Sequence, residues 1–257
     1  MKIIEDQFFE NFQKKTFVHD EQTSTLVRYF DMFSSIAAES LYVLDVPRKQ
    51  FCYVNPDDLL LCGFSVEDAL RLGFEFYVKI VYPEDSSLLE DIRKAVFQYL
   101  TDFEEKRDEI DYFFCTFRLQ RNYSFPTPHP LPQMVYHRMK HVWEDDELRY
   151  LICSVGSSTI KEAGNLRMHN KDGLTYEQYN FTTKRWKQKT KEPLTEREKA
   201  ILMLAQQGKS SREIANDLCK GQNTIRNQIK PLFSKLKVHS MQEAIEVARY
   251  HCMIYPK

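Results

Sequence analysis

Apolar residues near the N-terminus recur at the three- and four-residue spacing of amphipathic helices. Over residues 5–40 the recurring positions are Phe8, Phe9, Phe12, Leu26, Phe30, Phe33 and Ile36. This spacing gathers them on one side of a helix, so we predict helices in the N-terminal segment, residues 1–39. Such helices need a partner surface on which to bury their apolar side.

Between residues 40 and 158 the pattern predicts strands and helices in turn. Residues 40–55 hold two short apolar runs separated by a turn at 47–50, which predicts a β-hairpin. A helical stretch containing 61–70 follows, and then a helix from about 86 to 100. Three further strands are expected at 111–120, 133–143 and 149–157, the first two joined by a proline-rich loop. This order predicts the α+β class, an antiparallel sheet with helices over one face.

Residues 161–191 predict a small hairpin and a linker. The turn signal at 169–173 is flanked by apolar positions at 166–168 and 174–179. Five basic residues then gather in a short run: Lys184, Arg185, Lys187, Lys189 and Lys191. We expect this basic run to be a linker that adds only nonspecific attraction to phosphates.

The segment after Pro193 predicts four short helices. A hydroxyl residue precedes a glutamate by three positions in three places: Thr195 and Glu198, Ser210 and Glu213, Ser240 and Glu243. Each pair forms a capping box, which marks the start of a helix. We therefore expect helices over about 196–207, 211–218, from 222 onward and over 241–251. Gly208 is expected to end the first of them in the left-handed conformation.

The third of these helices has an apolar and a polar side. The inward positions are Ile225, Ile229, Leu232, Phe233 and Leu236, and the outward ones are Asn223, Thr224, Arg226, Asn227 and Lys230. With the tight turn at 219–221, the second and third helices have helix-turn-helix spacing. Arginine can fork onto guanine edges, asparagine can bridge adenine, and hydroxyls and lysine hold phosphates. The polar side therefore suits duplex DNA, and the alternative is an ordinary solvated face of a helical bundle.

Charge is divided unevenly along the 257 residues. The net charge is -1, yet residues 184–257 hold 16 Lys and Arg against 7 Asp and Glu, a balance of +9. The remaining residues therefore carry -10. Such asymmetry indicates nucleic acid or an acidic membrane surface as the partner of the basic end. A solvated surface is the alternative.

Composition also narrows the classes of function. No apolar run approaches the roughly 18 to 20 residues that span a bilayer, and the N-terminus lacks the apolar stretch of a signal peptide, so we expect a cytoplasmic protein with no membrane partner. The 7 glycines include no GxGxxG or GxxxxGK[ST] pattern, which leaves nucleotide-dependent chemistry without support. The 6 cysteines include no CxxC pair, which favours free thiols over a disulfide framework or a zinc site.

Five motifs follow one another along residues 193–250: Leu194-Thr195-Glu196-Arg197-Glu198, Gly208, Glu213-Ile214-Ala215, Thr224-Ile225-Arg226 and Lys235-Leu236. Together they resemble the LuxR-type helix-turn-helix. The resemblance implies a four-helix unit that inserts its third helix into the major groove and has its fourth helix available for dimerisation. It also implies DNA contacts from Thr224 and Arg226, neighbouring base or phosphate contacts from Asn227 and Gln228, and a basic position near the backbone at Lys235.

This segment departs from the family pattern at three positions. Gly221 stands where the family usually has a capping serine, at a cost of only a few tenths of a kcal/mol. Gln228 replaces a common histidine. Pro231 falls near the tenth residue of the third helix, where it removes an amide donor and crowds the carbonyl of Asn227. We expect a kink at Pro231 rather than the loss of the helix.

The preceding region carries three further short motifs: Tyr53-Val54-Asn55, Gly63-Phe64-Ser65 and Tyr82-Pro83-Glu84-Asp85. With the order of predicted elements, they resemble a PAS domain over about residues 40–158. The resemblance implies a sensory or dimerisation module that holds a small ligand between sheet and helices. The closing Asp-Ile-Thr of that family is Ser157-Ser158-Thr159 in this chain.

No residue pattern identifies a cofactor or a metal, and we expect neither. The cysteine motif of a flavin photosensor is absent, and the acidic pair Asp57-Asp58 lacks the partner motifs of a phosphoacceptor domain. His137 and His141 alternate onto one face of a predicted strand with Val135, Met139 and Trp143. We interpret them as surface or sheet-face histidines rather than haem ligands.

Four segments are predicted: N-terminal helices at 1–39, a PAS-like sensor domain at 40–160, a hairpin and basic linker at 161–191, and a LuxR-type helix-turn-helix domain at 192–257. The predicted protein is not an enzyme but a one-component transcription regulator that binds double-stranded DNA as a homodimer. A small-molecule ligand is expected in the PAS-like domain. The alternative is a PAS-based protein-interaction adaptor whose helix-turn-helix binds DNA weakly or nonspecifically.

Overall fold

A computed structural model describes residues 21–121, 131–158, 160–190, 192–236, 238–250 and 253–254. Its contacts divide the chain into two compact units. The first contains residues up to 172 and 176–189, and the second contains 173–175 and 190 onward. Each unit is described separately below.

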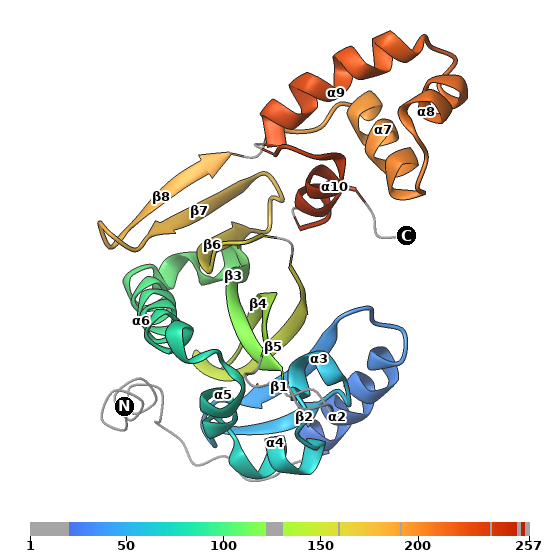
Figure 1. Ribbon diagram of the computed structural model, residues 1–257. Coiled ribbons are helices and arrows are strands. Elements are labelled where there is room, and N and C mark those ends of the chain that lie inside the picture. The colour runs from blue at the N-terminus through green and yellow to red at the C-terminus, as the bar shows by residue number, and fades with distance from the viewer. Residues whose placement is uncertain are drawn as a thin grey trace. The chain divides into compact units, whose positions relative to one another are not determined.

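The first unit is built on one eight-stranded antiparallel sheet (Figure 1). Its strands are β1 (Ser40–Asp45), β2 (Gln50–Val54), β3 (Ile110–Arg121), β4 (Leu131–Glu144), β5 (Glu147–Ser157), β6 (Gly164–Asn170), β7 (Thr175–Asn180) and β8 (Arg185–Thr190). Their order across the sheet is β2-β1-β5-β4-β3-β6-β7-β8. The predicted hairpin at 40–55 and the three predicted strands after residue 110 are confirmed. The α+β class is confirmed as well.

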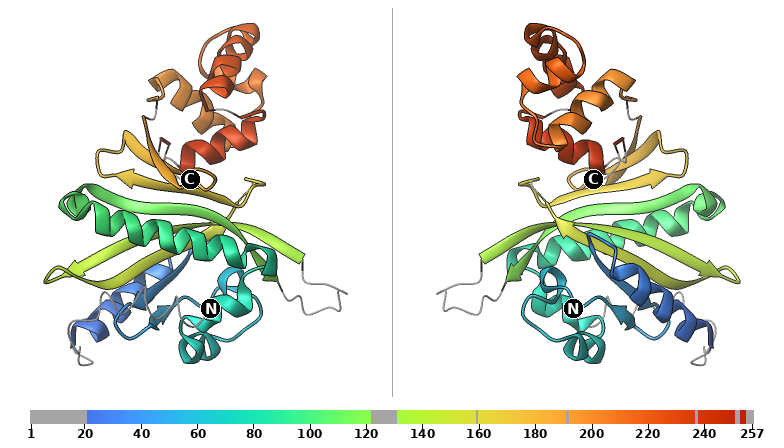
Figure 2. Two further views of the ribbon diagram at one scale, coloured as in Figure 1. Left: turned by 90° about the vertical axis from the view of Figure 1, so that its left-hand side faces the viewer. Right: turned by 90° about the vertical axis from the view of Figure 1, so that its right-hand side faces the viewer.

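Helices cover both faces of this sheet (Figure 2). One face carries α3 (Asp58–Leu61), α4 (Val66–Leu72), α5 (Glu75–Ile80) and α6 (Ser86–Asp102), with the 3-10 turns η1 (Pro83–Asp85) and η2 (Glu104–Glu109). The main core lies between them and the sheet and includes Phe76, Ile92, Tyr99, Phe113 and Phe117. On the other face α2 (Glu21–Ser34) packs against β1 and β2. The sequence pattern predicted helices over one face only.

Helix α2 is shorter at its C-terminal end than the pattern predicted. It ends at Ser34, whereas helical structure was expected to about residue 39. Ser34 Oγ donates to the Asp31 carbonyl at 2.9 Å and Ser35 Oγ donates to the Met32 carbonyl at 2.8 Å. These hydroxyls satisfy carbonyls that a further helical turn would otherwise use. The predicted helical positions before residue 21 lie outside the described residues.

The basic run predicted as a linker is instead largely the last strand of the sheet. Arg185–Thr190 form β8, next to β7, so residues 164–190 contribute three strands rather than a hairpin and a linker. Trp186 fixes the strand, because its ring contacts those of Tyr99, Phe113 and Tyr179 at centroid distances of 4.9, 6.1 and 5.1 Å. Lys187 is exposed. The packing of this one aromatic side chain therefore stabilises a strand in a segment whose basic composition predicts a linker.

The second unit contains four helices in its described part: α7 (Glu196–Gln206), α8 (Ser211–Asp217), α9 (Gln222–Leu236) and α10 (Met241–Tyr250). The start of each was predicted correctly, and the predicted ends of α7, α8 and α10 agree to within about a residue. Thr195 with Glu198 and Ser210 with Glu213 form the expected reciprocal capping boxes. Helix α9 continues through Pro231, which confirms that the helix is retained, and a bend there stays a prediction.

Candidate functional site

The turn between α8 and α9 sets the direction of the third helix. Cys219 takes a left-handed conformation with φ +50°, and the Lys220 amide donates to the Ala215 carbonyl at 2.8 Å. The Gly221 carbonyl then accepts from the amides of Thr224 at 3.0 Å and Ile225 at 3.2 Å, which starts α9. Ala215 is buried, and its small side chain allows the two helices to approach each other.

Five exposed polar residues form what we call the polar face of α9: Asn223, Thr224, Arg226, Asn227 and Lys230. Ile225 and Leu232 on the opposite side are fully buried in the core of the second unit. Because these apolar side chains anchor the helix, the polar face is presented outward on a rigid element. The structure thus brings together five of the seven residues that the sequence suggested for DNA contact.

The other two suggested residues are engaged with helix α7. Arg197 Nε donates to Gln228 Oε1 at 2.9 Å. Lys235 Nζ lies 2.9 Å from Glu198 Oε2, and both side chains are partly buried. Lys235 therefore joins α9 to α7, and it does not extend from the surface as the exposed lysines do. No local pattern predicts these contacts, since Arg197 and Gln228 are 31 positions apart.

Glu198 is the centre of this contact. It accepts hydrogen bonds from the Thr195 amide at 2.7 Å, the Thr195 hydroxyl at 3.0 Å and the Lys235 ammonium group. Partial burial raises the pKa of Glu198, but the hydrogen bonds from Lys235 and Thr195 outweigh it and the net pKa is lowered. The carboxylate is thus held ionised, and it ties the start of α7 to the end of α9.

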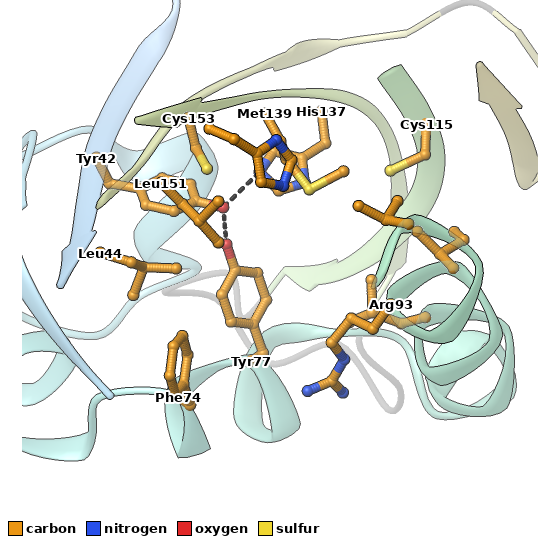
Figure 3. A pocket seen from close by; sticks show the side chains of 14 residues that line it. Tyr42, Leu44, Phe74, Tyr77, Arg93, Cys115, His137, Met139, Leu151 and Cys153 are labelled. Atoms are coloured by element: carbon orange, nitrogen blue, oxygen red, sulfur yellow. Dashed lines mark hydrogen bonds between the residues drawn. The ribbon is translucent and has the colours of Figure 1, made fainter. Parts of the chain in front are cut away.

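A second candidate site is a cavity of about 80 Å³ between the sheet and helices α5 and α6 (Figure 3). Its lining comes from several elements: Tyr42 and Leu44 on β1, Phe74 and Tyr77 around α5, Leu89, Ile92, Arg93 and Val96 on α6, Cys115 on β3, His137, Met139 and His141 on β4, and Leu151 and Cys153 on β5. Most of these side chains are apolar. Such concave, mainly apolar sites with a few polar groups are typical of small-molecule binding.

The polar groups of the cavity are joined in a chain. The Tyr77 hydroxyl donates to the Tyr42 hydroxyl, which in turn is hydrogen-bonded to His137 Nε2 (Figure 3). Burial lowers the pKa of His137 to about 3, and burial, aided by the charge of Lys140, does the same for His141. Both imidazoles are therefore neutral at pH 7.

The expectation that His137 and His141 share one face of their strand is confirmed, since both line the cavity. The surface interpretation is wrong for His137, which is only 4% exposed. Among the described residues, no group of three or more His, Cys, Asp or Glu side chains could hold a metal ion. No helix in the described part of the chain is long and apolar enough to cross a membrane.

The geometry of the second unit is that of a helix-turn-helix domain, with a short helix, a tight turn and a second helix that presents a polar face. Residues 192–248 match the family model for bacterial regulatory proteins of the luxR family. The C-terminal unit is therefore a LuxR-type helix-turn-helix domain, which confirms the resemblance seen in the sequence.

Similar proteins include the transcriptional regulatory protein DesR of Bacillus subtilis (strain 168), which is 45% identical over 53 residues. That alignment covers 21% of this chain, and it spans about a quarter of the relative, 27% of its length. A solved structure of the Vibrio cholerae VqmA dimer in the absence of target DNA is 17% identical over 90% of both chains, with a TM-score of 0.32. A Vibrio cholerae VqmA complex with ligand and DNA is 15% identical, covers 90% of this chain and 91% of that one, and has the same TM-score of 0.32.

Proposed function

We propose that this chain is a sequence-specific DNA-binding transcription regulator. In this proposal the first unit is a PAS-like sensory domain that controls the LuxR-type domain, and the protein acts in the cytoplasm as a homodimer on duplex DNA. The observation that carries the proposal is the polar face of α9, which presents five exposed side chains on a helix anchored by buried residues of a LuxR-type domain. Catalysis forms no part of the proposed function.

The side chains of the polar face fit the two kinds of contact that sequence-specific binding needs. Arg226, Asn223 and Asn227 have the donor geometry to contact base edges in the major groove. Thr224 and Lys230 can hold phosphates and so fix the register of the helix on the duplex. Lys235 and Gln228, which contact α7, are assigned to positioning α9 rather than to direct base contact.

The first experiment selects from random duplexes with the purified full-length protein at two salt concentrations, followed by sequencing of the retained DNA. A palindromic motif with steep salt dependence is expected, because a dimer reads two half-sites and releases counterions from phosphates. Retained DNA without any motif at either salt concentration would contradict sequence-specific regulation.

The residue-level experiment is Arg226→Ala, measured on the selected duplex. The loss of a base contact is expected to weaken binding by about 1 to 3 kcal/mol and to relax base preference at one position. Arg28→Ala is the matched control, because Arg28 is an exposed arginine on α2 and its loss changes net charge equally. Equal effects of the two substitutions would refute the assignment of the polar face.

The alternative, an interaction adaptor with weak DNA binding, is favoured by one observation, the position of Pro231 inside α9 directly after Lys230. Pro231→Ala separates the two functions. If the chain is a transcription regulator, specific binding to duplex DNA is already present before the substitution. Binding that appears only after Pro231→Ala would instead favour the adaptor.

A further inference from the structure

Two histidines that line the cavity of the first unit each carry a polar atom that no described residue pairs. His137 is 4% exposed, and its Nδ1 atom is buried without a hydrogen-bond partner among the described residues. The same holds for Nδ1 of His141. Native interiors satisfy nearly all buried polar atoms, and an unsatisfied one costs about 1–3 kcal/mol. His137 also lines the cavity, so this unsatisfied nitrogen is the candidate contact for a ligand atom.

The hydrogen-bond chain decides whether His137 Nδ1 is a donor or an acceptor. Tyr77 donates its hydroxyl proton to the Tyr42 oxygen. Tyr42 then has its own proton to give to His137 Nε2, its other partner. A neutral imidazole carries one proton on its two nitrogens. In this arrangement Nε2 is the acceptor and the proton lies on Nδ1, so His137 would present an N–H donor to which no described residue offers an acceptor.

The remainder of the cavity favours an uncharged ligand. The described residues that line it include no carboxylate and no lysine, and burial raises the pKa of Tyr77 and of the Cys115 and Cys153 thiols, so these groups are neutral. Leu44, Met139 and other apolar side chains form most of the wall. A charged molecule that entered would lose its hydration with little compensation. Arg93 is the charged side chain among the lining residues, which makes an anion the alternative that needs testing.

The size of the cavity limits the ligand further. Its volume of about 80 Å³ is roughly half of the approximately 150 Å³ that accommodates benzene in an engineered apolar cavity. The occupant is therefore a molecule of only a few heavy atoms beyond the group that meets His137.

We propose that the cavity binds a small uncharged carbonyl compound, such as a ketone, aldehyde or amide, whose oxygen accepts the hydrogen bond from His137 Nδ1–H. The apolar body of the compound lies against Leu44, Met139 and the facing residues of α6. This assignment rests on the proposed sensory role of the first unit and names the chemistry that it senses.

Three probes of one shape test the ligand class on the full chain: acetone, isobutene and acetate. All have four heavy atoms in the same planar arrangement, so they differ only in the acceptor and the charge. Acetone is expected to bind about three- to tenfold more tightly than isobutene, as one net hydrogen bond provides, and acetate is expected to bind least. Saturation-transfer NMR measures the three affinities. Equal affinity of acetone and isobutene, or tightest binding of acetate, would overturn the proposal.

Tyr77→Phe tests the hydrogen-bond chain without removing the imidazole. It deletes the donor to Tyr42, so the Tyr42 hydroxyl can either donate to His137 Nε2 or accept from it, and both tautomers of His137 become available. The preference for acetone over isobutene is then expected to decrease. A preference that survives Tyr77→Phe unchanged would contradict the role assigned to the chain.

Long-range ¹H–¹⁵N NMR on the histidine-labelled full chain tests the tautomer directly. The His137 signals are assigned by their loss in His137→Gln. A protonated Nδ1 and a bare Nε2 are expected, and the reverse would overturn the donor assignment. Binding of the same preparation to duplex DNA is measured in parallel, so a failure of the ligand proposal is distinguished from a failure of the proposed function.

Discussion

The contact between Asp85 and Arg118 gives a sharp test of how the first unit is held together. Asp85 is 3% exposed, and its carboxylate accepts from the Arg118 amide at 2.7 Å and from the Arg118 guanidinium, with Nε at 3.1 Å. It thus joins the start of α6 to strand β3. Glu84, the preceding residue, lies 3.1 Å from the same guanidinium, but its side chain is 69% exposed.

Asp85 and Glu84 differ in burial and share Arg118 as their partner, so the stability lost on removing each can be compared. Removal of one member of a buried ion pair costs about 3–5 kcal/mol, because the other charge and its hydrogen bonds are left unpaired. The Arg118 side chain is 29% exposed, so water compensates in part and we expect Asp85→Ala to cost about 3 kcal/mol. An exposed pair contributes about 0–1 kcal/mol, so Glu84→Ala is expected to cost about 0.5 kcal/mol.

Tryptophan fluorescence during urea or thermal unfolding measures this unit alone. The chain has 2 tryptophans, Trp143 and Trp186, and both lie in the first unit. For a unit of this size about 1 kcal/mol shifts Tm by roughly 2–4 °C, so Asp85→Ala is expected to lower Tm by about 6–12 °C. Glu84→Ala is expected to lower it by no more than about 2 °C. Equal shifts for the two variants would refute the argument from burial.

Three further predictions concern pH and one backbone position. Burial lowers the pKa of His137 and His141 to about 3, so below about pH 6.5 the unfolded chain binds protons that the folded chain does not. The stability of the first unit is therefore full above about pH 6.5 and falls as the pH drops toward 3. Its urea midpoint is expected to be lower at pH 5 than at pH 7. Partial burial raises the pKa of Glu198, but the hydrogen bonds from Lys235 outweigh this effect and the net pKa is lowered. The ionised Glu198 therefore contributes to the stability of the second unit above about pH 4.5, and this contribution is lost below it. Hydrogen exchange in α7 and α9 should show this loss in the parent chain and not in Glu198→Gln. Gly208 has φ +83° with open space where a Cβ atom would lie, so Gly208→Ala should cost about 1–2 kcal/mol through backbone strain alone, and unchanged hydrogen exchange in α7 and α8 would contradict this.

The elements of the second unit could be predicted because their signals are local. The capping boxes at Thr195 and Ser210 mark helix starts within four residues of sequence, and the structure forms both. Gly208 at the end of the first helix is a signal of the same kind. The apolar positions of α9 follow from a period of three to four residues, which requires no knowledge of the partner helix.

Strand β8 could not be predicted in this way, because its stability comes from distant residues. Trp186 packs against Tyr99 on α6 and Phe113 on β3, which lie more than seventy positions away. The local composition of lysine and arginine is that of a solvated segment. The strand partner and the aromatic pocket exist only after the chain has folded, so the local pattern predicts a sheet that lacks this last strand.

The two candidate sites differ in the same respect. The polar face of α9 lies within one helix, and its exposed residues were identified from spacing alone. The ion pair of Lys235 with Glu198 links two helices, and the cavity draws its wall from six elements or their flanking residues. His137 and His141 were placed on one face correctly, yet the chain through Tyr42 and Tyr77 depends on how β1, β4 and α5 meet.

The correction at β8 also changes the kind of connection between the two units. The sequence suggested a hairpin and linker over residues 161–191, but the sheet continues to Thr190 and α7 begins at Glu196. Six peptide steps span at most about 20 Å when fully extended. Helix α6 lines the cavity through Ile92 and Val96 and also supports β8 through Tyr99. The same helix therefore contacts both the cavity and the last strand before the short connection to α7.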